Sequence, residues 1–180
     1  ITGVDGLERV LKGIRESIDV GFKPIKINYV LLKGVNDSEF WDFVEFTRSL
    51  GIILQVIELE PIGIGMDIFS KYYIPTSQFE RIVSSRCIRR LIRQNLHARP
   101  IYILENGAVI EFVKWFCNPD FCAHCTRIRL TPDGKLKTCI CSGYEIDLKP
   151  ALRPRINTEL IKELIVRANK LRRPYNRYRL

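Results

Sequence analysis

The chain has 180 residues, of which 46% are hydrophobic and 27% are charged, and it carries a formal net charge of +9. This composition supports an ordinary hydrophobic core and excludes a disordered tail. No apolar run approaches the ~20 residues that a membrane-spanning helix needs, and the start of the chain lacks the pattern of a secretion signal. We therefore expect a cytoplasmic protein with no membrane partner.

Positive charge is concentrated at the C-terminal end. Residues 149–180 contain ten basic and two acidic residues. Such a run attracts phosphate groups, but the chain contains no nucleic-acid reading motif with interleaved exposed aromatic residues. We interpret the run as a solvated face and expect no nucleic-acid partner.

Helices and strands alternate in the first third of the chain, which predicts a parallel sheet. Lys26 and Asn28 are expected on one face of the first strand, opposite its apolar residues. Two parallel strands alone would leave both edges and both faces uncovered. We therefore expect the last part of a larger (β/α) barrel whose beginning is absent, in preference to a small two-layer sheet. The predicted elements are a helix over residues 5–20, a strand over 25–32, a helix from about 38 to 50 and a strand over 52–59.

After residue 60 the pattern changes. A capping-box pattern at Ser77 and Glu80 predicts the start of a long basic helix that continues to Leu91. Asn106-Gly107 between apolar segments is a strong hairpin signal. The remaining expected features are a loop over residues 61–75, a second hairpin around 132–134 with strands over 126–131 and 135–141, and a last helix from about residue 157.

Six cysteines are present, and four of them lie in the motifs Cys122-x2-Cys125 and Cys139-x-Cys141. A Cys-x2-Cys turn lets two thiolates converge on a metal, and the second hairpin would return Cys139 beside them. Thiolates favour zinc or an iron–sulfur cluster, and a disulfide framework is less favoured in a chain without a secretion signal. The other two cysteines are Cys87, interpreted as a small buried residue on a helix, and Cys117, which is left unassigned.

The residues alone leave two kinds of metal site open. All four motif cysteines could bind one structural zinc ion. On an extended strand, however, Cys139 and Cys141 would project in parallel with alpha carbons ~6–7 Å apart, which is awkward for chelating one ion. If only Cys122, Cys125 and Cys139 bind, one metal position stays open, as a substrate-binding cluster requires.

Two arginines follow the Cys-x2-Cys motif. Arg127, Arg129 and Thr131 are predicted to share one strand face, with Ile128 and Leu130 on the other. Paired guanidinium groups beside a metal site suit phosphate oxygens and flat heteroaromatic rings. We predict an anion-binding surface here; the alternative is that the arginines are solvated or only neutralise thiolates.

The stretch Phe121–Cys139 (FCAHCTRIRLTPDGKLKTC) closely resembles the C-terminal cluster motif of the GTP 3',8-cyclases of molybdenum-cofactor biosynthesis, the MoaA family. The resemblance runs through nearly the whole chain. The other similar segments are residues 24–28, 34–37, 57–58, 147–148 and 152–153.

The resemblance implies a radical S-adenosylmethionine enzyme with an incomplete (β/α)6 barrel and two 4Fe–4S clusters. Such an enzyme converts GTP to (8S)-3',8-cyclo-7,8-dihydroguanosine 5'-triphosphate. Residues 1–75 would be the last βα units of the barrel, and residues 76–180 an α+β region with antiparallel hairpins that holds one cluster and GTP. The implied partners are GTP, the N-terminal half of the barrel and a second copy in a homodimer.

Site residues are carried over from the same resemblance. Cys122, Cys125 and Cys139 would ligate the cluster, whose unique iron would bind guanine. Lys26 would meet the triphosphate, which agrees with the cost of placing an unpaired lysine on an inward strand face. The residues that would contact GTP through the family's Arg-x-Arg segment are Arg127, Ile128 and Arg129.

The chain departs from the family in three respects. It contains no Cys-x3-Cys-x2-Cys motif for the cluster that splits S-adenosylmethionine, so no catalytic residue is assigned and we expect the chain alone to be inactive. Gln55 and Glu60 stand where some members have arginine and methionine, and residues 178–180 stand where many have a diglycine, so those roles are not carried over. The alternative function is a zinc-stabilised four-cysteine binding module; a peptide-maturing radical enzyme is less favoured, since those carry more C-terminal cysteines.

Overall fold

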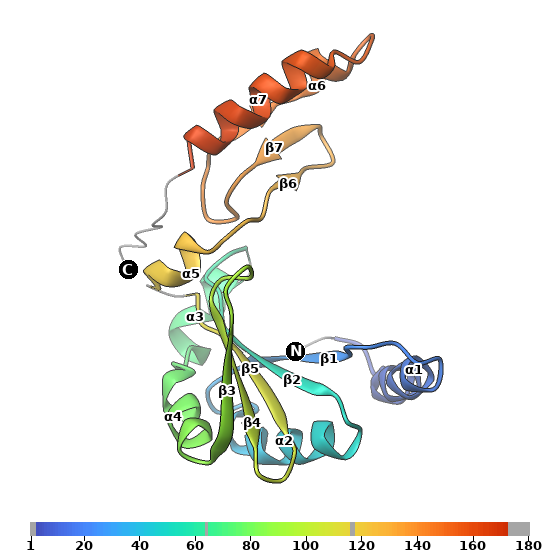
Figure 1. The fold of residues 1–180 in the computed structure, drawn as a ribbon, viewed down its shortest axis with the longest axis vertical. Coiled ribbons are helices and arrows are strands. Elements are labelled where there is room, and N and C mark those ends of the chain that lie inside the picture. Colours follow the sequence, from blue (N-terminus) through green and yellow to red (C-terminus); the bar gives the residue numbers. More distant parts are fainter. Residues whose placement is uncertain (1–2, 64, 116–117, 173–180) are drawn as a thin grey trace.

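The computed structural model describes residues 3–63, 65–115 and 118–172. It contains a five-stranded mixed sheet and a three-stranded antiparallel sheet, which lie at opposite ends of the molecule (Figure 1). Within these ranges, no helix has the length and apolar character needed to cross a membrane. The fold is of the α/β class, as predicted, whereas closure into a barrel stays a prediction.

The larger sheet has the strand order β1-β2-β5-β4-β3. β1, β2 and β5 run parallel, and β4 pairs antiparallel with both β5 and β3. The carboxyl ends of the parallel strands and the start of β4 therefore meet at one edge, which we call the carboxyl edge. The sheet takes strands from both sides of residue 75, and the division into two regions there stays a prediction. The strands are β1 (Lys26–Leu31), β2 (Ile53–Glu58), β5 (Val109–Val113), β4 (Arg99–Leu104) and β3 (Cys87–Arg93).

The first four predicted elements are confirmed. They are α1 (Leu7–Asp19), β1, α2 (Phe40–Ser49) with a short 3-10 turn before it (Asp37–Glu39), and β2. No residue of α1 is buried, and Leu7 on its apolar stripe is 64% exposed. In Figure 1, α1 stands beside the sheet, apart from the helices that cover it.

One face of the larger sheet forms the hydrophobic core. Helices α2 and α4 (Ser77–Ser85) cover it, and side chains such as Phe40, Leu54 and Phe112 are fully buried there. Glu80 does not complete a capping box; its carboxylate accepts a hydrogen bond from Tyr102 Oη over 2.8 Å. Burial and this hydrogen bond to Glu80 raise the pKa of Tyr102 to about 12.

The prediction of a featureless loop over residues 61–75 is wrong. Residues Gly65–Tyr72 form α3, whose Phe69 packs with Leu32 and Leu59 beyond the ends of β1 and β2. The start of the helix lies so close to the preceding chain that a Cβ at Gly65 would be 2.1 Å from the carbonyl oxygen of Glu60. Two prolines and two glycines in this segment concealed the short helix from sequence reasoning.

A helix that continues to Leu91 is also wrong. α4 ends at Ser85, and the chain continues as β3, which pairs with β4 along its whole length. The spacing of three between Ile88 and Leu91 fits a helix, but the backbone of β3 hydrogen-bonds to the edge of β4, and this pairing stabilises the strand instead. Cys87 consequently begins a strand and is half-buried, in contrast to the buried helical position expected.

The C-terminal part is a small two-layer unit in which α7 packs on the antiparallel sheet through Leu136, Leu148 and Ala168. α7 is confirmed, with the Asn157 side chain accepting a hydrogen bond from the backbone N–H of Leu160. The second hairpin is shorter than expected, so Arg127 precedes the strand, and Cys139 and Cys141 follow the next strand in a turn. The elements are α5 (Pro119–Ala123), β6 (Arg129–Leu130), β7 (Lys135–Lys137), β8 (Glu145–Asp147), α6 (Lys149–Leu152) and α7 (Thr158–Lys170).

Candidate functional site

A row of polar side chains crosses the face of the larger sheet that α2 and α4 leave open. Asn28 is the register partner of Gln55, and Gln55 is the register partner of Glu111. The Gln55 amide donates a hydrogen bond to Asn28 Oδ1 over 2.7 Å. We call this face, which carries the polar and charged side chains, the polar face. The opposite face carries the apolar core.

Glu111 is the centre of the polar face. Its side chain is fully buried and lies within ion-pair distance of Lys26, of Arg93 Nη1 at 3.2 Å and of Arg99 Nη1 at 3.9 Å. A buried carboxylate requires such partners. Three cations face one carboxylate, so the cluster keeps an excess of positive charge. Lys26, expected to meet a triphosphate, is thus paired within the chain.

Arg99 connects the polar face to the carboxyl edge. Its guanidinium is 5% exposed, donates a hydrogen bond from Nη1 to Gln55 Oε1 over 3.4 Å, and lies with Nη2 3.1 Å from His97 Nδ1. Burial lowers the pKa of Arg99, and the Glu111 carboxylate opposes that shift. Among the described residues, no group accepts a hydrogen bond from Arg99 Nε.

The predicted cysteine ligands lie on two segments. Cys122 is in α5, whose start is capped by the Asn118 side chain. Cys125 lies just after this helix, and its backbone N–H donates a hydrogen bond to the Cys122 carbonyl over 3.2 Å. Cys139 follows β7, and all three are half-buried. Within the described ranges, no three His, Cys, Asp or Glu side chains converge into a group that could hold a metal ion. Cys117 lies outside those ranges.

The surroundings of the Cys139 thiol favour its ionised form. A hydrogen bond from the Cys141 thiol is the largest of the effects that lower the pKa of Cys139 to about 5, and the charges of Arg172 and Arg129 add to it. Because metal ligands must be deprotonated, a thiol with this pKa is suited to bind metal at neutral pH.

The two arginines of the motif lie close to the carboxyl edge. Burial raises the pKa of Glu60, just after β2, and the charges of Arg129, Arg127 and Arg99 oppose that shift. Ile128 is 48% exposed between them. The structure therefore brings cationic side chains from two separate segments, the start of β4 and the segment at β6, near one carboxylate.

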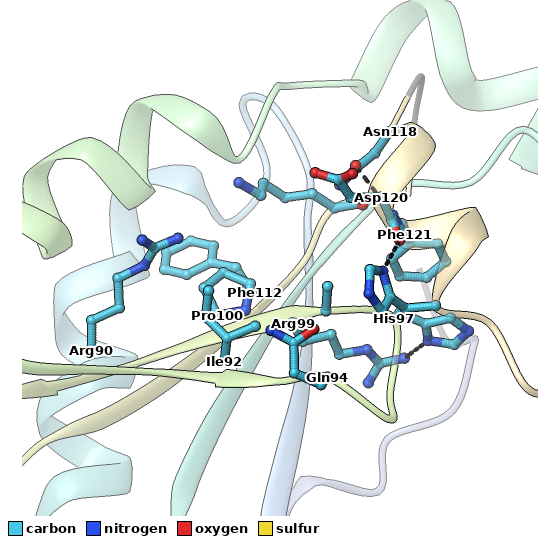
Figure 2. Close-up of a pocket in the computed structure, with 13 residues that line it drawn as sticks. Arg90, Ile92, Gln94, His97, Arg99, Pro100, Phe112, Asn118, Asp120 and Phe121 are labelled. Atoms are coloured by element: carbon cyan, nitrogen blue, oxygen red, sulfur yellow. Dashed lines mark hydrogen bonds between the residues drawn. The ribbon is translucent and has the colours of Figure 1, made fainter.

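His97 lies within the same positive field. The pKa of His97 is lowered to about 4, mainly by burial. The charges of four arginines lower it further: Arg99, Arg127, Arg172 and Arg129. The imidazole is 4% exposed and lines a pocket of about 350 Å³ between the β3–β4 turn and α5 (Figure 2). The folded protein thus keeps this histidine neutral at physiological pH.

The pKa of His97 predicts an acid-sensitive fold. The unfolded chain binds this proton below about pH 6.5 and the folded chain only near pH 4, so the free energy of unfolding should fall as the pH drops through that window, by up to ~3 kcal/mol. Urea unfolding of the wild type and of His97→Asn at pH 7 and pH 5 measures the effect. Asparagine tolerates the positive φ at this position but does not titrate. Equal loss of stability in both proteins would contradict the prediction.

Sequence reasoning missed Glu111, Arg99 and His97. The available signal was a single carboxylate inside the apolar strand segment VIEFV. A buried charge in a strand needs partners, but only the register of β5 against β2 and β4 identifies them. The role of His97 can be recognised only from its contacts with α5 in the structure.

Comparison with known proteins identifies the family of this chain. The family described as Molybdenum Cofactor Synthesis C matches residues 52–178. A probable GTP 3',8-cyclase of Metallosphaera sedula is 42% identical over 99% of this chain and 57% of its own length. Those of Saccharolobus solfataricus and Saccharolobus islandicus are 41% and 40% identical over 93% of this chain and 54% of theirs. The chain spans little more than half the length of these curated relatives, and it belongs to the Molybdenum Cofactor Synthesis C family.

Proposed function

We propose that this chain is the C-terminal portion of a GTP 3',8-cyclase of molybdenum-cofactor biosynthesis, and that it binds GTP beside an iron–sulfur cluster. The observation that carries the proposal is the gathering of Cys139, Arg127 and Arg129 at the carboxyl edge, within one field of charge. In sheets with parallel strands, ligands bind at this edge. The names of the relatives supply the nucleotide and the reaction.

The cysteine residues fit an iron–sulfur cluster by their chemistry. Three cysteine sulfurs are suitable donors, and the pKa of about 5 for Cys139 keeps that sulfur ionised. Each thiolate of a 4Fe–4S cluster binds a different iron, so the ligands need not converge on one point as zinc ligands do. Cys122, Cys125 and Cys139 would hold three irons, and the cluster, when bound, supplies a fourth iron with an open position for guanine.

The cationic side chains would bind the rest of GTP. Arg127 and Arg129 would donate hydrogen bonds to its oxygens, with the exposed Ile128 between them. Lys26 would contact the triphosphate, because Glu111 faces three cations and neutralises only one unit of their charge. The excess of positive charge on the polar face attracts a polyanion.

Formation of the radical belongs, in this proposal, to the longer protein. S-adenosylmethionine, a second 4Fe–4S cluster and the remaining part of the barrel would complete the enzyme, and the whole could assemble as a homodimer. This sequence contains no Cys-x3-Cys-x2-Cys motif. We therefore expect the chain to bind the cluster and GTP without turning GTP over.

Anaerobic reconstitution with iron and sulfide tests the cluster. We expect the wild-type chain to take up iron and sulfide in equal amounts, and Cys139→Ala to lose both, because a cluster held by three thiolates is lost when one is removed. Cys141→Ala, two residues away, removes a thiol not proposed as a ligand and should keep its iron, because coordination by iron itself deprotonates the Cys139 thiol once the Cys141 hydrogen bond is gone. Metal and sulfide analysis with the visible absorption spectrum measures the outcome.

The alternative is a zinc-stabilised binding module. The hydrogen bond between Cys141 and Cys139 is the observation that favours it, since these two thiols are near enough to bind one ion together. Stoichiometric zinc that is lost on Cys141→Ala would replace the cyclase assignment with this module. Absence of any cluster from the reconstituted wild type would also contradict the proposed function.

A further inference from the structure

The turn between β3 and β4 has an unusual backbone. His97 and Ala98 have φ angles of +61° and +48°, in the left-handed region that residues other than glycine seldom adopt. Two consecutive residues in this conformation persist only where their surroundings hold them. The contacts of His97 identify what holds the turn.

His97 makes two contacts with the cysteine segment. Its imidazole stacks on the Phe121 ring at a centroid distance of 4.0 Å and an interplanar angle of 11°. Its backbone N–H donates a hydrogen bond to the carbonyl oxygen of His124 over 3.1 Å. Phe121 directly precedes Cys122 and His124 directly precedes Cys125, so His97 contacts the segment next to both cysteines of the Cys-x2-Cys motif. Figure 2 shows His97 beside Phe121.

The same imidazole also contacts Arg99, which belongs to the polar face of the sheet. His97 Nδ1 lies 3.1 Å from Arg99 Nη2, and Arg99 also contacts Gln55 and Glu111. A guanidinium offers only donors, so Nδ1 must accept and the proton of the neutral ring lies on Nε2. His97 therefore joins the charged centre of the sheet to the segment that carries Cys122 and Cys125.

We propose that His97 is a positioning residue that fixes the Cys122–Cys125 segment relative to the polar face. Its stack on Phe121 and its contact with Arg99 set the place of the two thiols before any ligand binds. That these thiols hold a cluster rests on the proposed function; that His97 holds the segment does not. The strained turn is the means by which the ring reaches α5.

Alkylation of individual thiols tests the proposal in the purified chain before any metal is added. Iodoacetamide is applied under native conditions, and peptide mapping gives a rate for each cysteine. In His97→Ala we expect Cys122 and Cys125 to react about fivefold faster, as loss of a ring stack releases the segment locally. Cys87, at the far end of β3, is the internal reference and should keep its rate. Asn95→Ala, an exposed change in the same turn, is the matched control.

Unchanged rates at Cys122 and Cys125 in His97→Ala would overturn the proposal, as would an equal increase at Cys87, because general loss of stability would then explain the result. Phe121→Leu removes the stack from the other side and keeps the test open if His97→Ala does not fold. The double variant should react no faster than either single variant, since both remove one interaction. Effects that multiply in the double variant would contradict the stack as the cause.

The two proposals fail in different ways. A wild-type chain that takes up no iron would contradict the cluster assignment, but its alkylation rates would still test the positioning role of His97. Conversely, a chain that binds iron normally while His97→Ala leaves every thiol rate unchanged keeps the proposed function and removes the positioning role.

Discussion

Replacing Glu111 with alanine should lower the free energy of unfolding by about 3–5 kcal/mol, because removing one partner of a buried ion pair leaves the other charges uncompensated. The Glu111 side chain is fully buried, and Lys26, Arg93 and Arg99 all face it. Lys26 and Arg99 are themselves mostly buried, so water cannot replace the carboxylate fully. Urea unfolding at neutral pH measures the loss.

Glu45→Ala is the matched control for this experiment. Its carboxylate also forms an ion pair, with Arg48 on the same helix, but the Glu45 side chain is 57% exposed. Exposed pairs of this kind contribute little to stability, because solvent screens the two charges. A loss for Glu111→Ala as small as that for Glu45→Ala would mean that solvent already screens the cluster, and that Glu111 does not organise the polar face.

The double variant Arg127→Ala/Arg129→Ala should bind GTP more weakly by a factor of about 150 or more. Hydrogen bonds to charged groups contribute ~1.5–3 kcal/mol each, so losing two costs at least about 3 kcal/mol of binding free energy. Calorimetric titration of the reconstituted chain with GTP measures the change. Iron content should stay at the wild-type level, because neither residue is proposed as a ligand.

A charge-matched control separates local contacts from net charge. Arg15→Ala/Arg81→Ala removes the same two positive charges from exposed positions on α1 and α4, and its GTP affinity should fall by no more than a few fold at moderate ionic strength. Equal losses in the two double variants would indicate non-specific attraction of the nucleotide. Unchanged GTP affinity in Arg127→Ala/Arg129→Ala would remove these arginines from the site.

Local patterns were sufficient for the elements with a clear period. The helix period of α1 and α2, the alternation in β1 and the Asn106-Gly107 turn each identified the element present. The sequence does not predict β3 because Ile88 and Leu91, three positions apart, fit the helical period, and the strand conformation depends on pairing with β4, which no local pattern contains. That β5 would lie parallel beside β2 was likewise beyond sequence reasoning, since the partner is more than fifty positions away.

The candidate site divides in the same way. Cys122, Cys125 and Arg127 stood out because their spacing is compact and chemically specific. Glu111 and Arg99 did not, because a charge on a strand acquires a role only when neighbouring strands bring its partners. Charged residues gathered by tertiary pairing are therefore the part of such a site that a single sequence conceals.

The Asn106-Gly107 hairpin governs more than the local path of the chain. Gly107 N–H donates to the Leu104 carbonyl, and Leu104 N–H donates to the Ala108 carbonyl, each over 2.9 Å, which locks the start of β5. Successive side chains of a strand point to opposite faces. A slip of one position would carry the Glu111 carboxylate into the hydrocarbon layer under α2 and turn the Phe112 ring toward Lys26 and Arg99. An insertion of one residue into β5 would therefore exchange its two faces, whereas an insertion of two would restore them. The exposed Asn106-Gly107 turn thus fixes which side chains of β5 lie in the core and which lie on the polar face.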